Sequence, residues 1–386
     1  MPDTDQAFTA GVAKAAEVAA AHADEVDRDA RFPAEAIDVL RDAGALSALV
    51  PDHLGGRAVP FEVVADACHA LGRACSSTAM IFAMHQIQVA VIARHAADSE
   101  WFAGYLATVA SEQRLIASAT SEVGIGGDMG RSAAAVEGDG AGGCRFEKQA
   151  PTISYGQDAD DLFTTLRRHP DAEANDQVIV LTTKAQTTLR PTGTWDTLGM
   201  RGTCSPGFVA TAHFAADQVV PVPFAQVSAE SMVPISHLLW AHVWCGIAGE
   251  AFDRARAFVR AGAAKSGSAG VAGRRLSQAS ALLTRTRSDV SSALEYFERA
   301  SGEAGRPELS TMAAALRFNS LKITASEAAA EITQAALGIT GFAGYKNDTP
   351  FTVGRHLRDA LSAAVMVAND RLHESNAALL LVVKDA

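Results

Sequence analysis

The chain has 386 residues, of which 48% are hydrophobic and 20% are charged, and its formal net charge is −11. This length accommodates two or three domains with a large core, and the composition excludes a disordered chain. The negative net charge, with no block of Lys or Arg, argues against nucleic acid or an anionic membrane as the main partner.

The five cysteines contain no C-x-x-C pair, and their number is odd. We therefore expect free, mostly buried thiols in a reducing compartment and no metal site. The amino-terminal segment lacks the basic start and apolar core of a signal peptide. Because no apolar run reaches the roughly 18 residues of a membrane span, we expect a soluble, cytoplasmic protein.

The amino-terminal part of the chain, from residue 6 to about residue 110, has the period of amphipathic helices. Apolar residues recur at spacings of three and four over residues 36–46 and again over residues 63–74. Pro33 stands where the first turn of a helix tolerates proline. These signals predict a helical domain over residues 1–113.

The next part changes character. Short or alternating apolar runs, such as residues 178–181 and 208–210, are separated by Gly, Asp, Asn and Pro. This pattern predicts a β domain over residues 114–225. Helical periodicity returns near Pro234, and the long Ala- and Leu-rich helices that follow are typical of a bundle over residues 226–386.

A glycine-rich segment, residues 118–130, joins the first helical part to the β part. Its glycines leave backbone N–H groups free to meet an anionic or ring-shaped ligand, and Thr120 and Ser121 add hydroxyl donors. Taken alone, the segment also fits an ordinary glycine-rich hairpin.

Two later segments combine tight turns with cations. Residues 195–205, WDTLGMRGTCS, hold two glycines, one arginine and several hydroxyl groups, which indicates a polar turn between strands. Near the C-terminus, Arg355 and Arg358 lie on one helix face, where they can bind a diphosphate or the carboxylates of a neighbouring subunit. A solvated charged patch is the alternative for this pair.

In order along the chain, these segments resemble the acyl-CoA dehydrogenase family of flavoproteins. Residues 32–56 are similar to its F-P…G-G helix and loop, and residues 195–205 are similar to its G-M-R-x-T-x-S turn. Residues 118–130 resemble its T-E-P-x-x-G-S-D signature, with Val123 and Gly127 in place of the proline and the serine. The resemblance implies an α+β fold with an N-terminal all-α domain, a middle β-barrel-like domain and a C-terminal four-helix bundle.

The resemblance also implies a cofactor, which is FAD, with FMN as the alternative. Ser154 falls where the family places a hydroxyl on its second flavin-facing strand, and Thr152 replaces the usual tryptophan. A homo-oligomer, dimer or tetramer, is implied, together with an electron-transfer partner or a flavin reductase. The flavin contacts implied are Thr120, Ser121, Gly126, Gly127, Ser154, Arg355 and Arg358.

The catalytic base of the family is missing. Dehydrogenation of an acyl thioester needs a carboxylate within reach of the α-proton. Counting from Arg358 as in most members lands on Val367, and the position that a few members use falls at Ser236-His237. The acidic candidates are Glu250, about three to four helical turns further along, and Asp370, about one turn beyond Val367.

Three functions follow from this sequence. The leading hypothesis is an FAD-dependent acyl-CoA dehydrogenase that transfers hydride from the β-carbon of an acyl thioester to flavin. The alternative is a related flavin-dependent monooxygenase using reduced flavin and oxygen, with His85 or His237 near the ring. The third is a member without catalysis that serves as a binding protein.

Overall fold

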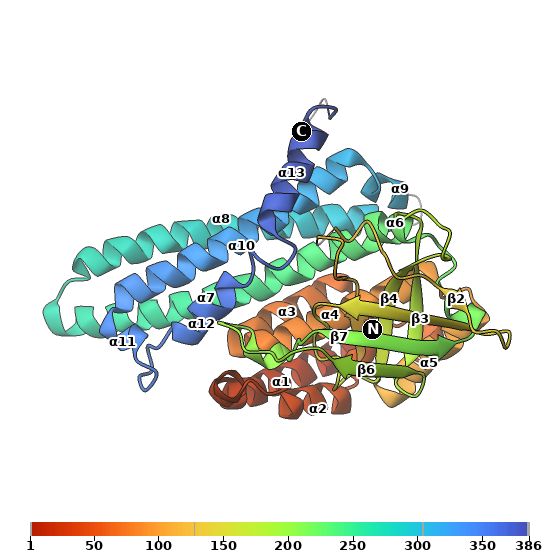
Figure 1. The fold of residues 1–386 in the computed structure, drawn as a ribbon. Helices are drawn as coiled ribbons and strands as arrows, with labels where there is room; N and C mark the ends of the chain where they lie inside the picture. The colour runs from red at the N-terminus through yellow and green to blue at the C-terminus, as the bar shows by residue number, and fades with distance from the viewer. Residues whose placement is uncertain (1, 127, 303–304, 384–386) are drawn as a thin grey trace.

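The structure is a computed structural model that describes residues 2–126, 128–302 and 305–383. It begins with a layer of helices (Figure 1). Each of these helices buries apolar side chains, as α1 does with Phe8, Val12 and Val26. Gly44 follows α2 with φ +66, a left-handed turn that glycine adopts readily. The helices of this layer are α1 (Pro2–Asp29), α2 (Ala34–Asp42), α3 (Phe61–Ala74), α4 (Ser76–His95) and α5 (Glu100–Glu112), with short 3₁₀ turns η1 (Ala45–Ser47) and η2 (Asp52–Leu54).

The middle of the chain forms two small sheets. One has the order β1-β4-β5, with β1 parallel to β4, and the other is antiparallel in the order β2-β3-β7-β6. Strands β4 and β5 are buried almost throughout, whereas β3 alternates between buried and exposed residues, so β3 has one solvated face. The strands are β1 (Ile116–Ala119), β2 (Glu137–Gly138), β3 (Cys144–Ala150), β4 (Asp161–Arg167), β5 (Gln177–Thr183), β6 (Thr187–Pro191) and β7 (Phe208–Phe214).

Three long helices dominate the last part of the chain: α7 (Val233–Ser266), α8 (Gly270–Ala300) and α10 (Met312–Thr340). They run side by side away from the sheets (Figure 1). Gly267 ends α7 in the left-handed region, and the Thr311 hydroxyl caps α10 by accepting the Ala314 N–H at 3.2 Å. The short elements are η3 (Arg201–Thr203), η4 (Ala216–Gln218), α6 (Phe224–Val227), the π-helical turn η5 (Ser228–Met232), α9 (Arg306–Leu309), α11 (Phe342–Tyr345), α12 (Gly354–Leu361) and α13 (Asn369–Leu380).

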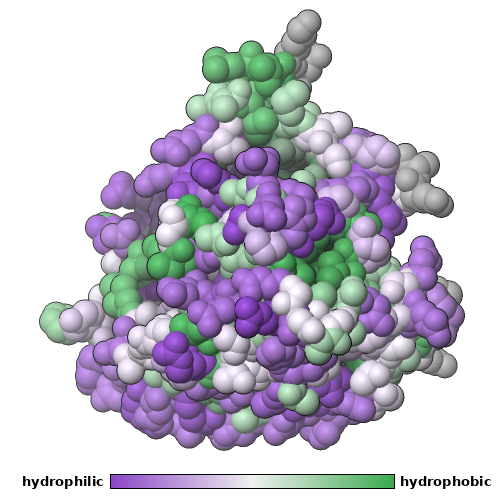
Figure 2. All heavy atoms as spheres, turned by 45° about the vertical axis from the view of Figure 1, so that its right-hand side comes forward, coloured by the Kyte–Doolittle hydropathy of each residue, from purple (hydrophilic) through white to green (hydrophobic). Residues whose placement is uncertain are grey.

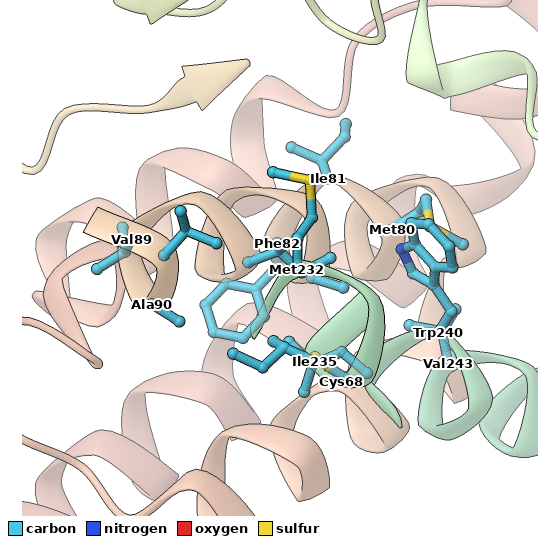
Figure 3. Close-up of a cluster of buried hydrophobic side chains, with 14 of the residues drawn as sticks. Cys68, Met80, Ile81, Phe82, Val89, Ala90, Met232, Ile235, Trp240 and Val243 are labelled. Atoms are coloured by element: carbon cyan, nitrogen blue, oxygen red, sulfur yellow. The ribbon is translucent and has the colours of Figure 1, made fainter. Parts of the chain in front are cut away.

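The main hydrophobic core is continuous across all three parts. Side chains of α4 such as Phe82 interdigitate with Ile235 and Met232 at the start of the bundle (Figure 3). Two helical runs, Ser76–His95 and Phe224–Lys265, are long and apolar enough to cross a membrane, although no such run was expected from the sequence. Because 89% and 94% of their apolar 18-residue windows are buried inside the protein, these windows belong to the core here.

The expected fold class is confirmed: helices, then sheets, then a helical bundle. One local expectation is wrong, because Ser154 does not lie on a strand. Strand β3 ends at Ala150, and residues 153–156 make a turn in which Tyr155 adopts φ +44. At the other end of the molecule, α13 projects from the body, and Figure 2 shows hydrophobic surface on this projection, where Leu381 and Val382 are exposed.

Candidate functional site

The turn at residues 195–205 docks on helix α12. The backbone N–H of Met200 donates to the buried carboxylate of Asp359 at 2.7 Å, and Arg358 donates to the Leu198 carbonyl at 2.9 Å. A Cβ at Gly199 would lie 2.2 Å from the Arg358 carbonyl oxygen, so only glycine permits this approach. Two segments singled out in the sequence are therefore in direct contact.

A second tether joins α13 to the glycine-rich segment. The Arg371 guanidinium on α13 donates to the Gly126 carbonyl. Gly124 and Gly126 adopt φ values of +91 and +61, which L side chains rarely adopt. Because Asp359 and Arg371 are both held on the β side, the turn between them, residues 362–368, lies across that side. We call this segment the 362–368 turn.

The β side carries a row of hydroxyl groups at residues 121, 154, 203 and 205. Ser205 bridges two of them, since its Oγ lies 2.9 Å from the Oγ of Ser154 and 2.9 Å from the Oγ1 of Thr203. Ser121 donates to the Thr152 carbonyl at 3.2 Å, which ties the ends of the two flanking strands together. Ser121 and Ser154 are half-buried, so their hydroxyls remain within reach of a ligand.

A buried ion pair supports the glycine-rich segment from behind. Glu122 accepts hydrogen bonds from the Ser132 hydroxyl at 2.7 Å and from the Ala134 N–H at 2.7 Å, so it closes the segment into a loop. Lys148 lies 3.7 Å from the Glu122 carboxylate and donates to the Thr165 carbonyl at 2.7 Å. Burial lowers the pKa of Lys148 to about 8.

Sequence reasoning missed Lys148, although a signal was present. Along β3, Phe146, Lys148 and Ala150 occupy the inward positions of an alternating strand, and the residues between them are exposed. A lysine at an inward position of such a strand needs a buried partner. Glu122, which corresponds to the glutamate of the T-E-P-x-x-G-S-D signature, is that partner.

The helical side of the site carries no carboxylate on the 362–368 turn, whose sequence is SAAVMVA. Val367 adopts φ +51, which turns its carbonyl toward α10. There the buried Lys322 ammonium donates to the Val367 carbonyl at 2.8 Å and to the Asn369 side-chain oxygen at 2.6 Å. The turn therefore has no proton-accepting carboxylate, and the Lys322 ammonium holds its backbone from the α10 side.

Helix α7 contributes aromatic rings beside Lys322. Burial lowers the pKa of His237 to about 4, so its ring is neutral, and its Nδ1 lies 3.0 Å from the Phe318 carbonyl oxygen. The His237 and Trp240 rings are 6.0 Å apart. The indole N–H groups of Trp240 and Trp244 are buried and have no hydrogen-bond partner in the described part of the chain.

The other predicted histidine has a structural role. His85 Nε2 lies 2.7 Å from the Leu46 carbonyl oxygen, and its Nδ1 accepts the Ile116 N–H at 3.1 Å. Nε2 is therefore the protonated nitrogen and donates to Leu46. With both ring nitrogens engaged by backbone and its pKa lowered to about 4 by burial, His85 fastens α4 to η1 and β1 and has no nitrogen left for a ligand.

The acidic candidates lie apart from one another. Glu250 accepts hydrogen bonds from Arg73 at 2.9 Å and from Arg254 at 3.1 Å, which engages both of its oxygens between α3 and α7. Asp370 is exposed in the first turn of α13, directly after the 362–368 turn. Neither carboxylate faces the hydroxyl row in any described contact.

The two arginines near the C-terminus form ion pairs with aspartates of the same chain. Arg355 donates to Asp24 at 3.2 Å, and Arg358 forms a bidentate pair with Asp27, so both guanidinium groups contact carboxylates of α1. Two other expected contacts remain: Thr120 is half-buried at the end of β1, and Gly127 lies outside the described residues.

A cavity of about 360 Å³ opens beside the glycine-rich segment, between β5, η5 and the start of α10. Its described lining contains amide, hydroxyl and aromatic groups but no charged side chain. The Gln177 Oε1 atom is buried and has no partner among the described residues, while its Nε2 donates to the Met129 carbonyl at 3.1 Å. The amide and hydroxyl side chains in the lining indicate a polar ligand, and they belong to Asn175, Gln177, Ser228, Ser310, Thr311 and Asn319.

Comparison with known proteins places the chain in a family of flavin-dependent enzymes. Family models named acyl-CoA dehydrogenase N-terminal domain and C-terminal domain match residues 2–113 and 229–367. An L-evernosamine nitrososynthase from a Micromonospora species is 26% identical over 360 residues, which cover 90% of this chain and 82% of the relative.

Two solved structures share the fold over nearly their whole length. KijD3 in complex with FMN and dTDP-3-amino-2,3,6-trideoxy-4-keto-3-methyl-D-glucose superposes with a TM-score of 0.83 at 21% identity, covering 99% of this chain and 95% of KijD3. FMN-bound TdsC from Paenibacillus sp. A11-2 gives a TM-score of 0.82 at 20% identity, with 97% of both chains covered.

Proposed function

The chain belongs to the acyl-CoA dehydrogenase superfamily of flavin-dependent oxidoreductases, and on that basis we propose that it is a monooxygenase using reduced flavin and oxygen. The observation that carries the proposal is the 362–368 turn. A dehydrogenase needs a carboxylate at the substrate α-proton, and this turn has only apolar and small side chains. The Lys322 amine bonds the backbone of the turn, at the Val367 carbonyl. The proposal replaces acyl thioester dehydrogenation, the reaction favoured from the sequence.

The residues of the β side fit a flavin ring. Ser121 and Ser154 supply hydroxyl donors, and the positive-φ glycines of the glycine-rich segment allow backbone N–H groups to approach a planar ligand. The buried indole N–H groups of Trp240 and Trp244, which have no partner among the described residues, are further donors on α7. When bound, reduced flavin would supply the electrons that activate oxygen. The protein's own contribution is to hold the ring and exclude water around it.

We infer that the flavin is FMN. In this family an FAD cofactor extends toward the segment that carries Arg355 and Arg358, and a diphosphate would need free cations there. Arg355 is instead paired with Asp24, and Arg358 with Asp27, both in the same chain. Neither guanidinium group is therefore free to neutralise a diphosphate. The KijD3 and TdsC structures, which share the fold, contain FMN.

For the substrate we propose a polar small molecule, such as an amino sugar, whose uncharged part enters the 360 Å³ cavity. The Gln177 oxygen is an acceptor without a partner in the described ranges of the chain, so a ligand N–H or O–H would satisfy it. An acyl chain would leave this oxygen and the neighbouring hydroxyls desolvated. The name of the nitrososynthase relative refers to an amino sugar, which agrees with this choice.

Oxygen consumption tests the proposal directly. The purified protein is supplied with FMN, NADH and a flavin reductase, and oxygen uptake and hydrogen peroxide are recorded with and without amino sugars. Amino-sugar-dependent oxygen uptake that exceeds peroxide release is the expected result, because oxygen is then incorporated into the substrate.

Two outcomes would favour the other hypotheses. Anaerobic bleaching of bound flavin by an acyl-CoA would support the dehydrogenase. Failure to bind either FMN or FAD would support a binding protein without catalysis. Chromatography of the flavin released by acid distinguishes FMN from FAD.

A further inference from the structure

Helices α10 and α13 meet through a ladder of polar side chains. Asn319 donates to the Asn376 side-chain oxygen at 3.0 Å, and the Asn369 amide donates to the Ser326 hydroxyl at 3.1 Å. Between these contacts lies Lys322, which bonds the Asn369 oxygen at 2.6 Å. Residues 319, 322 and 326 lie on one face of α10 because they are three and four positions apart.

Burial of Lys322 costs folding free energy. The residue is fully buried, and its Nζ lies 5.8 Å from the centre of the Trp244 ring. Its hydrogen bonds go to neutral oxygens, those of Val367 and Asn369, and in the described part of the chain it forms no ion pair with a carboxylate. A buried charge without a counter-charge is destabilising, so a methionine would serve packing alone at lower cost. Its position points to a role in the site.

We propose that Lys322 is a positioning residue that fixes the 362–368 turn against the flavin site, by holding the Val367 carbonyl and the Asn369 side chain with its ammonium group. This inference rests on the proposed flavin-dependent function. The turn is then held from both sides, by Lys322 on the bundle and by the Asp359 and Arg371 tethers on the β side.

The charge on Lys322 is sensitive to pH. Burial lowers the pKa of Lys322 to about 8, and Glu327 on α10 opposes this shift. The ionisable group that faces it from α7 is His237, which is neutral at this pH, while α13 presents the Asn369 amide. Above pH 8 the ammonium loses its charge, and its hydrogen bonds to the turn lose their charge-assisted strength.

The test measures FMN affinity by quenching of flavin fluorescence between pH 6.5 and 9.5. The wild-type protein should bind FMN several-fold more weakly above pH 8. Lys322→Met should weaken binding about tenfold at pH 7, since it removes charge-assisted bonds, and should abolish the pH dependence. The matched control is Lys14→Met, a change at an exposed lysine of α1, which should behave as the wild type.

A second variant distinguishes positioning from a general contribution to folding. Asn369→Asp places a carboxylate beside the ammonium group, and the nearby negative charge favours the charged form of Lys322. The pH at which FMN binding weakens should then rise by about one unit. Loss of a packing contact alone would not move this pH, and the variant decides the question if Lys322→Met does not fold.

The inference is overturned if Lys322→Met binds FMN with wild-type affinity and pH dependence, or if Asn369→Asp leaves the pH of weakening unchanged. A wild-type protein that binds no flavin at any pH would instead remove the proposed function, and with it the premise of this inference.

Discussion

The two faces of the candidate site differ in what they retain of the dehydrogenase pattern. The β face has the hydroxyls of Ser121 and Ser154 and a glycine-rich loop closed by Glu122. The helical face has an apolar turn at residues 362–368, with the amine of Lys322 behind it. The face proposed to hold the cofactor therefore keeps hydroxyl groups and positive-φ glycines, and the face that would supply the base has no carboxylate.

This difference indicates how one fold supports several reactions. Binding a planar ring depends on backbone shape and hydroxyl donors, which many substrates share. The reaction depends on a few side chains at the reactive edge, and replacing one carboxylate removes proton abstraction without disturbing the ring site. The following predictions test the two faces separately, from the largest expected effect to the smallest.

Acid should destabilise the helical parts first. Burial lowers the pKa of His69, His85, His95 and His237 to about 4, whereas the β-part histidines His169 and His213 are exposed. Between pH 6.5 and 4 these histidines are protonated in the unfolded chain but stay neutral in the folded one. Acid therefore favours the unfolded chain, and the free energy of unfolding falls as the pH drops through this range. Hydrogen exchange at pH 7 and pH 5 should show loss of protection in α4 and α7 before the β strands. Earlier loss in the strands would contradict this difference between the two regions.

On the β face, Glu122→Ala should be strongly destabilising. It leaves the Lys148 ammonium buried without its carboxylate and frees the N–H groups of the loop, which costs about 3–5 kcal/mol. Thermal unfolding and FMN binding should both be impaired. The control is Glu137→Ala, which breaks the exposed pair with Arg145 and should cost less than about 1 kcal/mol. Similar losses in the two variants would remove the special role of the buried pair.

On the helical face, Asp359→Ala should loosen the first tether. The buried N–H of Met200 then has no acceptor, a loss of about 1–3 kcal/mol in the free energy of unfolding. Asp348→Ala, which removes the exposed partner of Lys346, serves as the control and should have little effect. Urea unfolding measures both. If Asp359→Ala is as stable as its control, the docking of the 195–205 turn on α12 does not depend on the hydrogen bond from Met200 to Asp359.

The smallest effect is expected at the flavin hydroxyls. Ser121→Ala removes one hydroxyl, whose hydrogen bond is worth about 1 kcal/mol, and should weaken FMN binding about fivefold while lowering the free energy of unfolding by no more than about 1 kcal/mol. Ser111→Ala, at an exposed serine of α5, is the matched control. Fluorescence quenching gives both affinities, and an unchanged affinity in Ser121→Ala would show that the ring does not lie against this side chain.

Much of the architecture could be predicted from the sequence because its signals are local. Helical periodicity and short alternating runs gave the correct order of helices, sheets and bundle, and the glycines at 199 and 126 marked turns that the structure confirms. The missing carboxylate was also evident, since it required only counting from Arg358 to Val367. The strand expected at Ser154 was wrong, because a turn after β3 has no periodic signal.

The partners of individual polar side chains were decided by the tertiary structure alone. His85 is a plausible ligand in sequence, but backbone groups from η1 and β1 use both of its nitrogens. Lys148 and Lys322 became significant only when burial and distant chain segments supplied Glu122 and the 362–368 turn. A sequence pattern records which residues repeat along the chain. The free energy of a buried charge or hydrogen bond depends on atoms that lie far apart along the chain. Only folding determines which of these atoms come into contact.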